Sequence, residues 1–180
     1  MKELSLNILD VAKNSVTAGA KNVIIDVIEK PDRLTISIKD NGCGMTPEFV
    51  ARVTDPFTTT RTTRKVGLGL PLMKMEAQMS GGDLEIKSEV GVGTEVVTWF
   101  DPRNIDMPPL GDIVSSIITL IQGSPDIDFV FTHARGGESY TLDTGEIRAI
   151  MGDVSLAEME VILWLTDYLK ENEAGLPKAE

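Results

Sequence analysis

Residues 33–45 read RLTISIKDNGCGM, and this stretch carries the strongest structural signal in the chain. Apolar and polar side chains alternate from Arg33 to Asp40, which is typical of a strand with one buried face. The glycine-rich segment 40–45 then ends the strand, because closely spaced glycines favour a turn. The stretch therefore predicts a strand that finishes on a carboxylate beside a glycine-rich loop.

The segments on either side show clear periodicity. Apolar residues at helical spacing predict a first helix over 4–18, and β-branched runs at 22–29 and 33–40 predict a hairpin. Turn signals then separate the following elements: a helix at 47–53, a loop at 55–69, a helix at 71–79 and strands at 83–88 and 94–100. Helices and strands follow one another within the same segment of chain, so we expect the α+β fold class.

The composition changes at 101–109, where three prolines and few large residues indicate a connector. We expect a first domain at 1–101, a connector at 102–109 and a small α+β extension at 110–180. Its elements are an apolar helix at 110–122, a hairpin of 128–134 with 139–143, and a terminal helix that opens with a capping box at Ser155 and Glu158. The extension itself has no motif that assigns a role.

Charge and composition restrict the classes of function. The chain has 180 residues and a formal net charge of −11, which opposes general affinity for nucleic acid or an anionic membrane. A single cysteine and a single histidine exclude a disulfide framework and a multi-histidine metal site. The N-terminus lacks the apolar core of a signal peptide, so we expect a cytoplasmic protein.

Polar side chains near the start of the chain can hold a metal ion. Asp10 and Asn14 stand four residues apart on the first predicted helix, so both lie on one face. A carboxylate and an amide oxygen suit Mg²⁺, which takes oxygen ligands. The alternative is an ordinary solvated face of the helix.

Two further segments can bind a nucleotide. Asp40, at a strand end, can accept a hydrogen bond from an exocyclic amine such as adenine N6, although an Asp-Asn-Gly turn is also common. The segment 67–70 precedes a helix and offers backbone amides to phosphate. No acid interrupts the chain between Phe57 and Met75, where Arg61 and Lys65 supply positive charge. This gap suits a polyphosphate.

Taken in order, these motifs resemble the family that unites gyrase, Hsp90, histidine kinases and MutL. The resemblance covers about the first hundred residues and rests on the following segments: an N-box at 10–15, a first glycine box at 40–45, a Pro-Phe box at 55–59, a second glycine box at 67–70 and a Gly-x-Gly-Thr at 91–94. It implies a Bergerat-type two-layer α/β sandwich, in which helices cover one face of a mixed sheet.

The resemblance also assigns roles to residues, with ATP and Mg²⁺ as cofactors. Asp40 is expected to bind adenine with help from Thr94, and Asn14 to ligate Mg²⁺. Asp10 stands where hydrolytic members carry glutamate, so it is the candidate catalytic base, although its side chain is one methylene shorter. The other expected nucleotide contacts are Gly42, Gly44 and Met45 in the first glycine box and Arg61, Lys65, Gly67, Leu68, Gly69 and Leu70 around the second.

Three functions are compatible with these motifs. The leading one is a protein kinase of the histidine-kinase-like or anti-sigma-factor type that phosphorylates an unidentified partner protein. The second is a nucleotide-gated binding module without phosphotransfer, and the third is a MutL-like repair ATPase, which the negative charge disfavours. We expect no nucleic-acid or membrane partner, and a homodimer is an option.

Several conspicuous residues have simple structural interpretations. His133 shares a strand face with Phe129 and Phe131, so we expect a packed side chain rather than a phosphoacceptor. The other expected core residues are Trp99 and Trp164 and the methionines Met73, Met75 and Met79.

Overall fold

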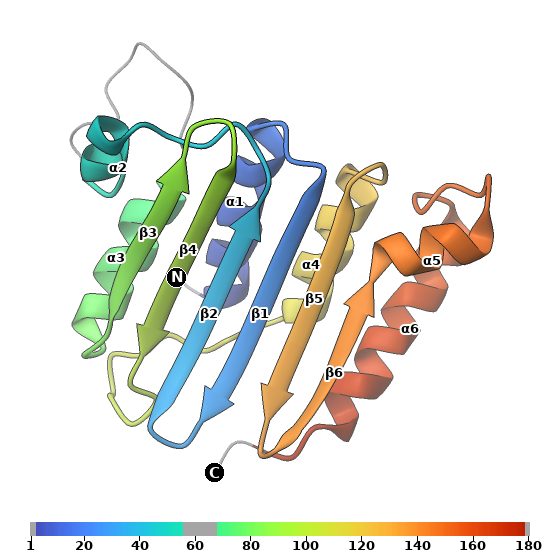
Figure 1. Cartoon of the computed structure of the whole chain (residues 1–180). Coiled ribbons are helices and arrows are strands. Elements are labelled where there is room, and N and C mark those ends of the chain that lie inside the picture. The colour runs from blue at the N-terminus through green and yellow to red at the C-terminus, as the bar shows by residue number, and fades with distance from the viewer. Residues whose placement is uncertain (1–2, 56–67, 179–180) are drawn as a thin grey trace.

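A computed structural model describes residues 3–55 and 68–178. It contains one mixed six-stranded sheet in the order β3-β4-β2-β1-β5-β6, with the helices on one face (Figure 1). The elements are α1 (Leu4–Thr17), β1 (Asn22–Lys30), β2 (Arg33–Asp40), α2 (Pro47–Val53), α3 (Gly69–Met79), β3 (Asp83–Glu89), β4 (Gly93–Phe100), α4 (Ile113–Gly123), β5 (Asp128–Arg135), β6 (Glu138–Asp143), α5 (Thr144–Met151) and α6 (Met159–Gly175). The predicted fold class, an α+β two-layer sandwich, is confirmed.

The hairpin of β1 and β2 forms the centre of the sheet. Its register runs from Val23 opposite Asp40 to Lys30 opposite Arg33, so a two-residue turn closes it. Alternate side chains of β1 are fully buried, among them Ile25 and Val27. The strands therefore present an apolar face to the helices and leave the other face open.

Helix α1 covers this apolar face and positions the polar residues at its end. Leu4, Ile8, Val11 and Ala12 are buried at helical spacing, which confirms the predicted first helix. The same helix contacts α3 on one side and α4 on the other. Its opposite flank keeps Asp10 exposed.

The predicted extension continues the same sheet. The hairpin of β5 and β6 has the expected strands, and β5 lies parallel to β1, with Asn22 opposite Asp128 and Glu29 opposite Arg135. Helix α4 packs between α1 and α6. That 1–101 and 110–180 fold as separate domains stays a prediction. In the structure, strands from both segments belong to one sheet.

Some details of the extension differ from the sequence expectations. Helix α5 was not predicted, and α6 begins at Met159 with Glu158 as its N-cap. The capping-box prediction is wrong, because the Ser155 hydroxyl accepts a hydrogen bond from the Ala157 amide and holds a turn before the helix. Within 3–55 and 68–178, the helices lack the length and apolar character needed to cross a bilayer.

The predicted core residues are correct only in part. Met73 is fully buried, but Met75 and Met79 face solvent because they lie on the outer side of α3. Trp99 is half-buried on the open face of the sheet, where the Arg33 guanidinium lies 4.8 Å from its ring centre. The prediction that Trp164 is buried is wrong, since more than half of its side chain is exposed.

Candidate functional site

A pocket opens where β2 ends, between α1, α2, the start of α3 and the start of β4. Its polar lining comes from Asn14, Ser15, Asp40 and Thr94. The remaining walls are mainly apolar and are formed by Val11, Thr17, Ala18, Cys43, Gly44, Met45, Phe49, Val53, Leu70 and Val96. A few polar groups on an apolar wall are typical of a small-molecule site.

Asp40 is held firmly at the end of β2. Its Oδ2 accepts a hydrogen bond of 2.6 Å from the Ser15 hydroxyl, and its Oδ1 accepts one of 2.8 Å from the Gly42 amide. Each carboxylate oxygen has a second lone pair, so the group can still accept a hydrogen bond from a ligand. Ser15 belongs to the N-box at 10–15, but no role was predicted for it.

The glycines of this site are needed for close packing of the chain itself. Gly44 has a φ of +67°, and a Cβ there would lie 1.9 Å from the Glu89 carbonyl oxygen. A Cβ on Gly93 would lie 2.0 Å from the Asp40 carbonyl oxygen. The first glycine box can therefore approach the turn between β3 and β4, and Asp40 lies next to the start of β4.

Ser88 links the first glycine box to the start of β4. Its hydroxyl accepts a hydrogen bond of 2.8 Å from the Met45 amide and donates one of 3.0 Å to the Gly93 carbonyl. The Thr94 hydroxyl lies 2.8 Å from the Ser88 hydroxyl oxygen. Ser88 thus fixes Thr94 opposite Asp40, its register partner on β2. No pattern in the sequence indicates a role for Ser88, because its contacts form only when β3 and β4 pair.

Asn14 is the polar side chain of the pocket with a buried donor that lacks an acceptor among the described residues. Its Nδ2 is buried, and among the described residues it has no hydrogen-bond partner. A buried N–H donor without an acceptor costs free energy unless a ligand supplies one. Asp10 lies one turn earlier on α1 and is exposed, outside the lining of the pocket.

The start of α3 lies against α1 beside these residues. Gly69 opens the helix, and a Cβ there would lie 3.1 Å from the Asp10 Cβ. Leu68, the N-cap, is exposed and makes no side-chain cap. Leu70 contributes to the pocket wall. This geometry brings the second glycine box next to the N-box, as its expected role requires.

The predicted site residues thus fall into three groups. The pocket is lined by Asn14, Asp40, Gly44, Met45, Leu70 and Thr94. Asp10, Gly42, Leu68 and Gly69 lie beside it and contribute to its framework. Arg61, Lys65, Gly67 and most of the Pro-Phe box lie outside the described residues. The individual roles of all these residues in ligand binding stay predictions.

Comparisons with known proteins agree with this arrangement. Residues 1–104 match the family model described as histidine kinase-, DNA gyrase B- and HSP90-like ATPase. The Non-motile and phage-resistance protein of Caulobacter vibrioides is 34% identical over 124 residues, which cover 64% of this chain and 15% of that protein. The Sensor protein SrrB of Staphylococcus aureus is 32% identical over 102 residues, covering 54% of this chain and 17% of SrrB.

A solved structure supports the fold. The N-terminal domain of a DNA repair protein superposes with a TM-score of 0.55 at 15% sequence identity, covering 79% of this chain and 53% of that chain. At this identity the likeness concerns the fold alone. The chain spans about one sixth of the length of these two relatives.

Proposed function

The chain belongs to the histidine kinase-, DNA gyrase B- and HSP90-like ATPase family, and from this premise we propose that it binds ATP·Mg²⁺ and phosphorylates a partner protein. The observation that carries the proposal is the coincidence of Asp40 and the unsatisfied Asn14 amide in one pocket. Asp40 is an oriented anionic acceptor, and Asn14 has an N–H donor that a ligand can satisfy.

The pocket fits an adenine base. Phe49, Val53 and Val96 give it apolar walls for a flat aromatic ring, and Asp40 provides a fixed acceptor for an exocyclic amine. Because Ser15 and Gly42 already orient the carboxylate, little side-chain entropy is lost when a base binds. This geometry favours adenine over a base whose corresponding group is a carbonyl.

The residues on α1 fit a magnesium ion that arrives with a nucleotide. Asn14 offers an amide oxygen as a ligand, and its unpartnered Nδ2 has an N–H that can donate to the nucleotide. Mg²⁺ is commonly held by one or two protein oxygens together with substrate phosphates. The start of α3 adds backbone amides and a positive helix end for phosphate.

When bound, ATP·Mg²⁺ supplies the transferable phosphoryl group and the positive charge that stabilises it. The chain's own contribution is positioning: Asp40 and Thr94 fix the base, and Asn14 and α3 fix the other end. Asp10 is near Gly69 and can accept a proton from an attacking hydroxyl if the acceptor is brought to it. Its exposure leaves room for a protein substrate.

Asp40→Asn tests the adenine assignment. The asparagine oxygen can still accept from the Gly42 amide, and its NH₂ can donate to the Ser15 oxygen, so the fold is expected to survive. The NH₂ then replaces an acceptor toward the ligand, and we expect ATP affinity to fall roughly 10- to 100-fold. Calorimetric titration measures this loss.

Asp26→Asn is the matched control, because Asp26 lies on β1 but faces the open side of the sheet. Its ATP affinity is expected to equal that of the wild type. Unchanged affinity in Asp40→Asn, with an unchanged melting temperature, would remove Asp40 from the site.

Transfer to a partner needs its own test. A pull-down with and without ATP, followed by incubation with γ-labelled ATP, is expected to label a co-purified protein. Label that disappears with Asp10→Asn but not with Asp106→Asn would support Asp10 as the base. Asp106 is a suitable control because it is exposed in the connector.

The nucleotide-gated module without phosphotransfer remains the second candidate. The observation that favours it is Asp10, which lies outside the pocket lining and is one methylene shorter than the glutamate of hydrolytic members. In that case the partner binds only with ATP present and carries no label.

A further inference from the structure

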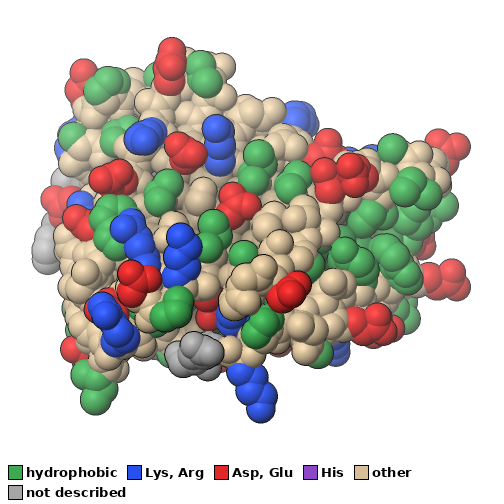
Figure 2. Space-filling model, turned by 60° about the horizontal axis from the view of Figure 1, so that its bottom comes forward, with side chains coloured by type: hydrophobic (Ala, Val, Ile, Leu, Met, Phe, Trp, Pro, Cys, Tyr) green, Lys and Arg blue, Asp and Glu red, His purple; other side chains and the backbone are tan. Residues whose placement is uncertain are grey.

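Hydrophobic side chains gather on the outside of α5 and α6 (Figure 2). These helices lie at the opposite edge of the sheet from α3 (Figure 1). Leu163 and Trp164 are 57% and 54% exposed, and Ile150 is 85% exposed. Val154 and Met159, in and just after the turn between the helices, are exposed as well. Single exposed apolar residues are ordinary, but a contiguous group indicates an interaction surface. We call these five residues the α5–α6 patch.

The aromatic part of the patch is held in place before any partner binds. The Trp164 ring stacks on Tyr168, with the ring centres 5.7 Å apart. The Tyr168 hydroxyl donates a hydrogen bond of 3.1 Å to the Thr141 carbonyl on β6. A fixed, half-exposed tryptophan loses little entropy on binding and is typical of the residues that dominate interface energies.

Acidic side chains surround the patch. Glu160, Asp167 and Glu171 are exposed and lie three or four residues from Leu163, Trp164 or Tyr168, on the same side of α6. Figure 2 shows Asp and Glu side chains at the edge of the hydrophobic area. The single base of α6, Lys170, lies near α4, where it helps to lower the pKa of Asp112 after the stronger effect of Ser115.

From this apolar centre and acidic rim we propose that the α5–α6 patch docks a basic amphipathic helix of a partner protein. The apolar face of such a helix covers Leu163 and Trp164, and its lysine or arginine side chains meet the acidic rim. A second copy of this chain fits less well, because its own acidic rim would face the first. The same charge opposes an anionic membrane surface.

The inference is independent of the nucleotide site, since the α5–α6 patch and the pocket lie at different parts of the sheet. The two proposals can therefore fail separately. In the experiments below, ATP affinity is measured on every variant and is expected to stay within about twofold of the wild type.

A designed peptide tests the proposal. The probe is a helical peptide of about 20 residues with leucine at i, i+3, i+4 and i+7 spacing and lysine elsewhere. Binding is followed by the fluorescence of Trp164 in a Trp99→Phe background, where it is the only tryptophan. We expect a blue shift that saturates, because the peptide removes Trp164 from water, and an affinity that weakens with salt.

Variants locate the binding surface. Leu163→Lys should weaken peptide binding about tenfold or more, since it replaces buried apolar contact with a like charge. Met79→Lys is the matched control, because Met79 is also 57% exposed but lies on α3. It should change binding less than about twofold. Glu160→Gln combined with Asp167→Asn should weaken binding and flatten its salt dependence.

Four outcomes would overturn the proposal. The first is equal peptide binding by the wild type and Leu163→Lys. The second is equal binding of a control peptide in which glutamate replaces every lysine. The third is a wild-type dimer in sedimentation that Leu163→Lys converts to a monomer, which would assign the surface to a second copy. The fourth is binding to anionic lipid vesicles that Leu163→Lys abolishes.

Discussion

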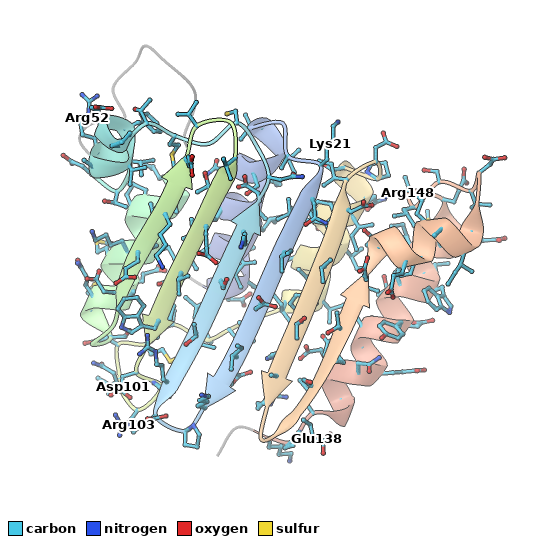
Figure 3. All side chains as sticks on the ribbon, in the orientation of Figure 1. Lys21, Arg52, Asp101, Arg103, Glu138 and Arg148 are labelled. Carbon is cyan, nitrogen blue, oxygen red and sulfur yellow. The ribbon has the colours of Figure 1, made fainter. Side chains whose placement is uncertain are left out.

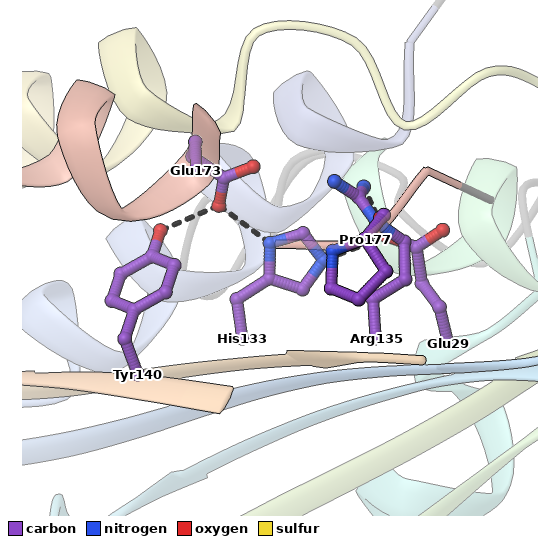
Figure 4. Close-up of polar contacts among 6 residues, drawn as sticks. All are labelled: Glu29, His133, Arg135, Tyr140, Glu173 and Pro177. Atoms are coloured by element: carbon purple, nitrogen blue, oxygen red, sulfur yellow. Dashed lines mark hydrogen bonds and ion pairs between the residues drawn. The ribbon is translucent and has the colours of Figure 1, made fainter. Parts of the chain in front are cut away.

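The two halves of the sheet use polar side chains in different ways. Around β2 and β4, Asp40, Asn14 and Thr94 line an open pocket, and a buried nitrogen of Asn14 has no hydrogen-bond partner among the described residues. On β5 and β6, the polar groups satisfy one another. His133, fully buried, lies 2.5 Å from Glu173 Oε1 and 2.7 Å from Glu29 Oε1 (Figure 4).

The network around His133 ties the end of α6 to the sheet. Glu173 also accepts a hydrogen bond of 2.5 Å from the Tyr140 hydroxyl, and Arg135 donates to both Glu29 and the Pro177 carbonyl. Arg148 of α5 points toward the start of β5 and pairs there with Asp128 (Figure 3). Unsatisfied polar groups mark a binding site, whereas a closed network of this kind supports the structure.

Deleting 102–180 should have the largest effect. Removal of β5 turns β1 from an interior strand into an edge, and loss of α4 uncovers α1. We expect the remaining chain to aggregate, because it exposes unpaired backbone and apolar surface together. Soluble yield measures this, and co-expression of 102–180 as a second chain should restore it. A soluble 1–101 that binds ATP would instead support the two-domain division expected from the sequence.

His133→Phe should give the next largest effect. The phenylalanine removes the shared partner of Glu29 and Glu173, two partly buried carboxylates. Glu29 keeps Arg135 and Glu173 keeps the Tyr140 hydroxyl, so we expect a loss of roughly 2 kcal/mol. Urea unfolding measures the loss, and ATP affinity should be unchanged in the folded protein. Phe131→Leu, on the same strand face, is the control for altered core packing.

The network also makes a prediction about pH. Burial opposes the imidazolium, but hydrogen bonds to Glu173 and Glu29 outweigh it, and the pKa of His133 is raised above 6.5. The pKa values of both glutamates are lowered below 4.5, although burial alone would raise them. The stability from His133 is therefore complete below pH 6.5 and lost as pH rises through the raised pKa.

The glutamate contribution has the opposite sign. It is present above pH 4.5 and lost as pH falls through the lowered pKa values. Neutral imidazole has one N–H and can donate to only one of the two carboxylates. The free energy of unfolding of the wild type should thus decline toward high pH, and His133→Phe should lack this decline. An equal decline in both proteins would contradict the assignment.

The sequence predicted local features better than features that depend on pairing between distant strands. Residues 40–45 and 10–15 carry their own chemistry, so the strand-end carboxylate and the helical Asn14 were found in advance. Ser88 was missed because its hydroxyl reaches Met45 and Thr94 only after β3 and β4 pair. The hydrogen bonds of the His133 network join residues up to 106 positions apart, so no local pattern reveals it.

The same limit explains the errors at the surface. Trp164 was expected in the core because large aromatic residues are commonly buried, but Val161, Ile162 and Leu165 already fill the inner face of α6. The composition change at the connector predicted two domains, and this division stays a prediction, but the pairing of β5 with β1 was not foreseen. Which sheet a strand joins depends on non-local contacts that composition does not encode.

Asn14→Ala should change stability less than His133→Phe does, and in the opposite direction. It removes a buried amide nitrogen that has no partner among the described residues, so the melting temperature should stay the same or rise slightly. ATP affinity should fall about tenfold with Mg²⁺ present and much less with EDTA. Equal losses under both conditions would refute the metal assignment.

The smallest expected effect concerns His133 itself, which we expect to carry no phosphate. A histidine that attacks a phosphoryl group needs an accessible ring nitrogen with a lone pair directed at it. The ring of His133 is fully buried, and both of its nitrogens face glutamate oxygens within 2.7 Å. Because each nitrogen is held in a hydrogen bond with a glutamate oxygen, neither is free to attack a phosphoryl group, and the raised pKa of His133 further favours the protonated ring, which has no free lone pair.

The measurement is incubation of the pure protein with γ-labelled ATP, followed by acid treatment. His133 is the only histidine, so acid-labile label from phosphohistidine could arise nowhere else. We expect none, in the wild type or in His133→Gln. Strong acid-labile label in the wild type that disappears in the variant would mean that β5 and α6 separate enough to expose the ring. The polar network of the extension would then be a regulated contact and the contrast between the two halves of the sheet would fail.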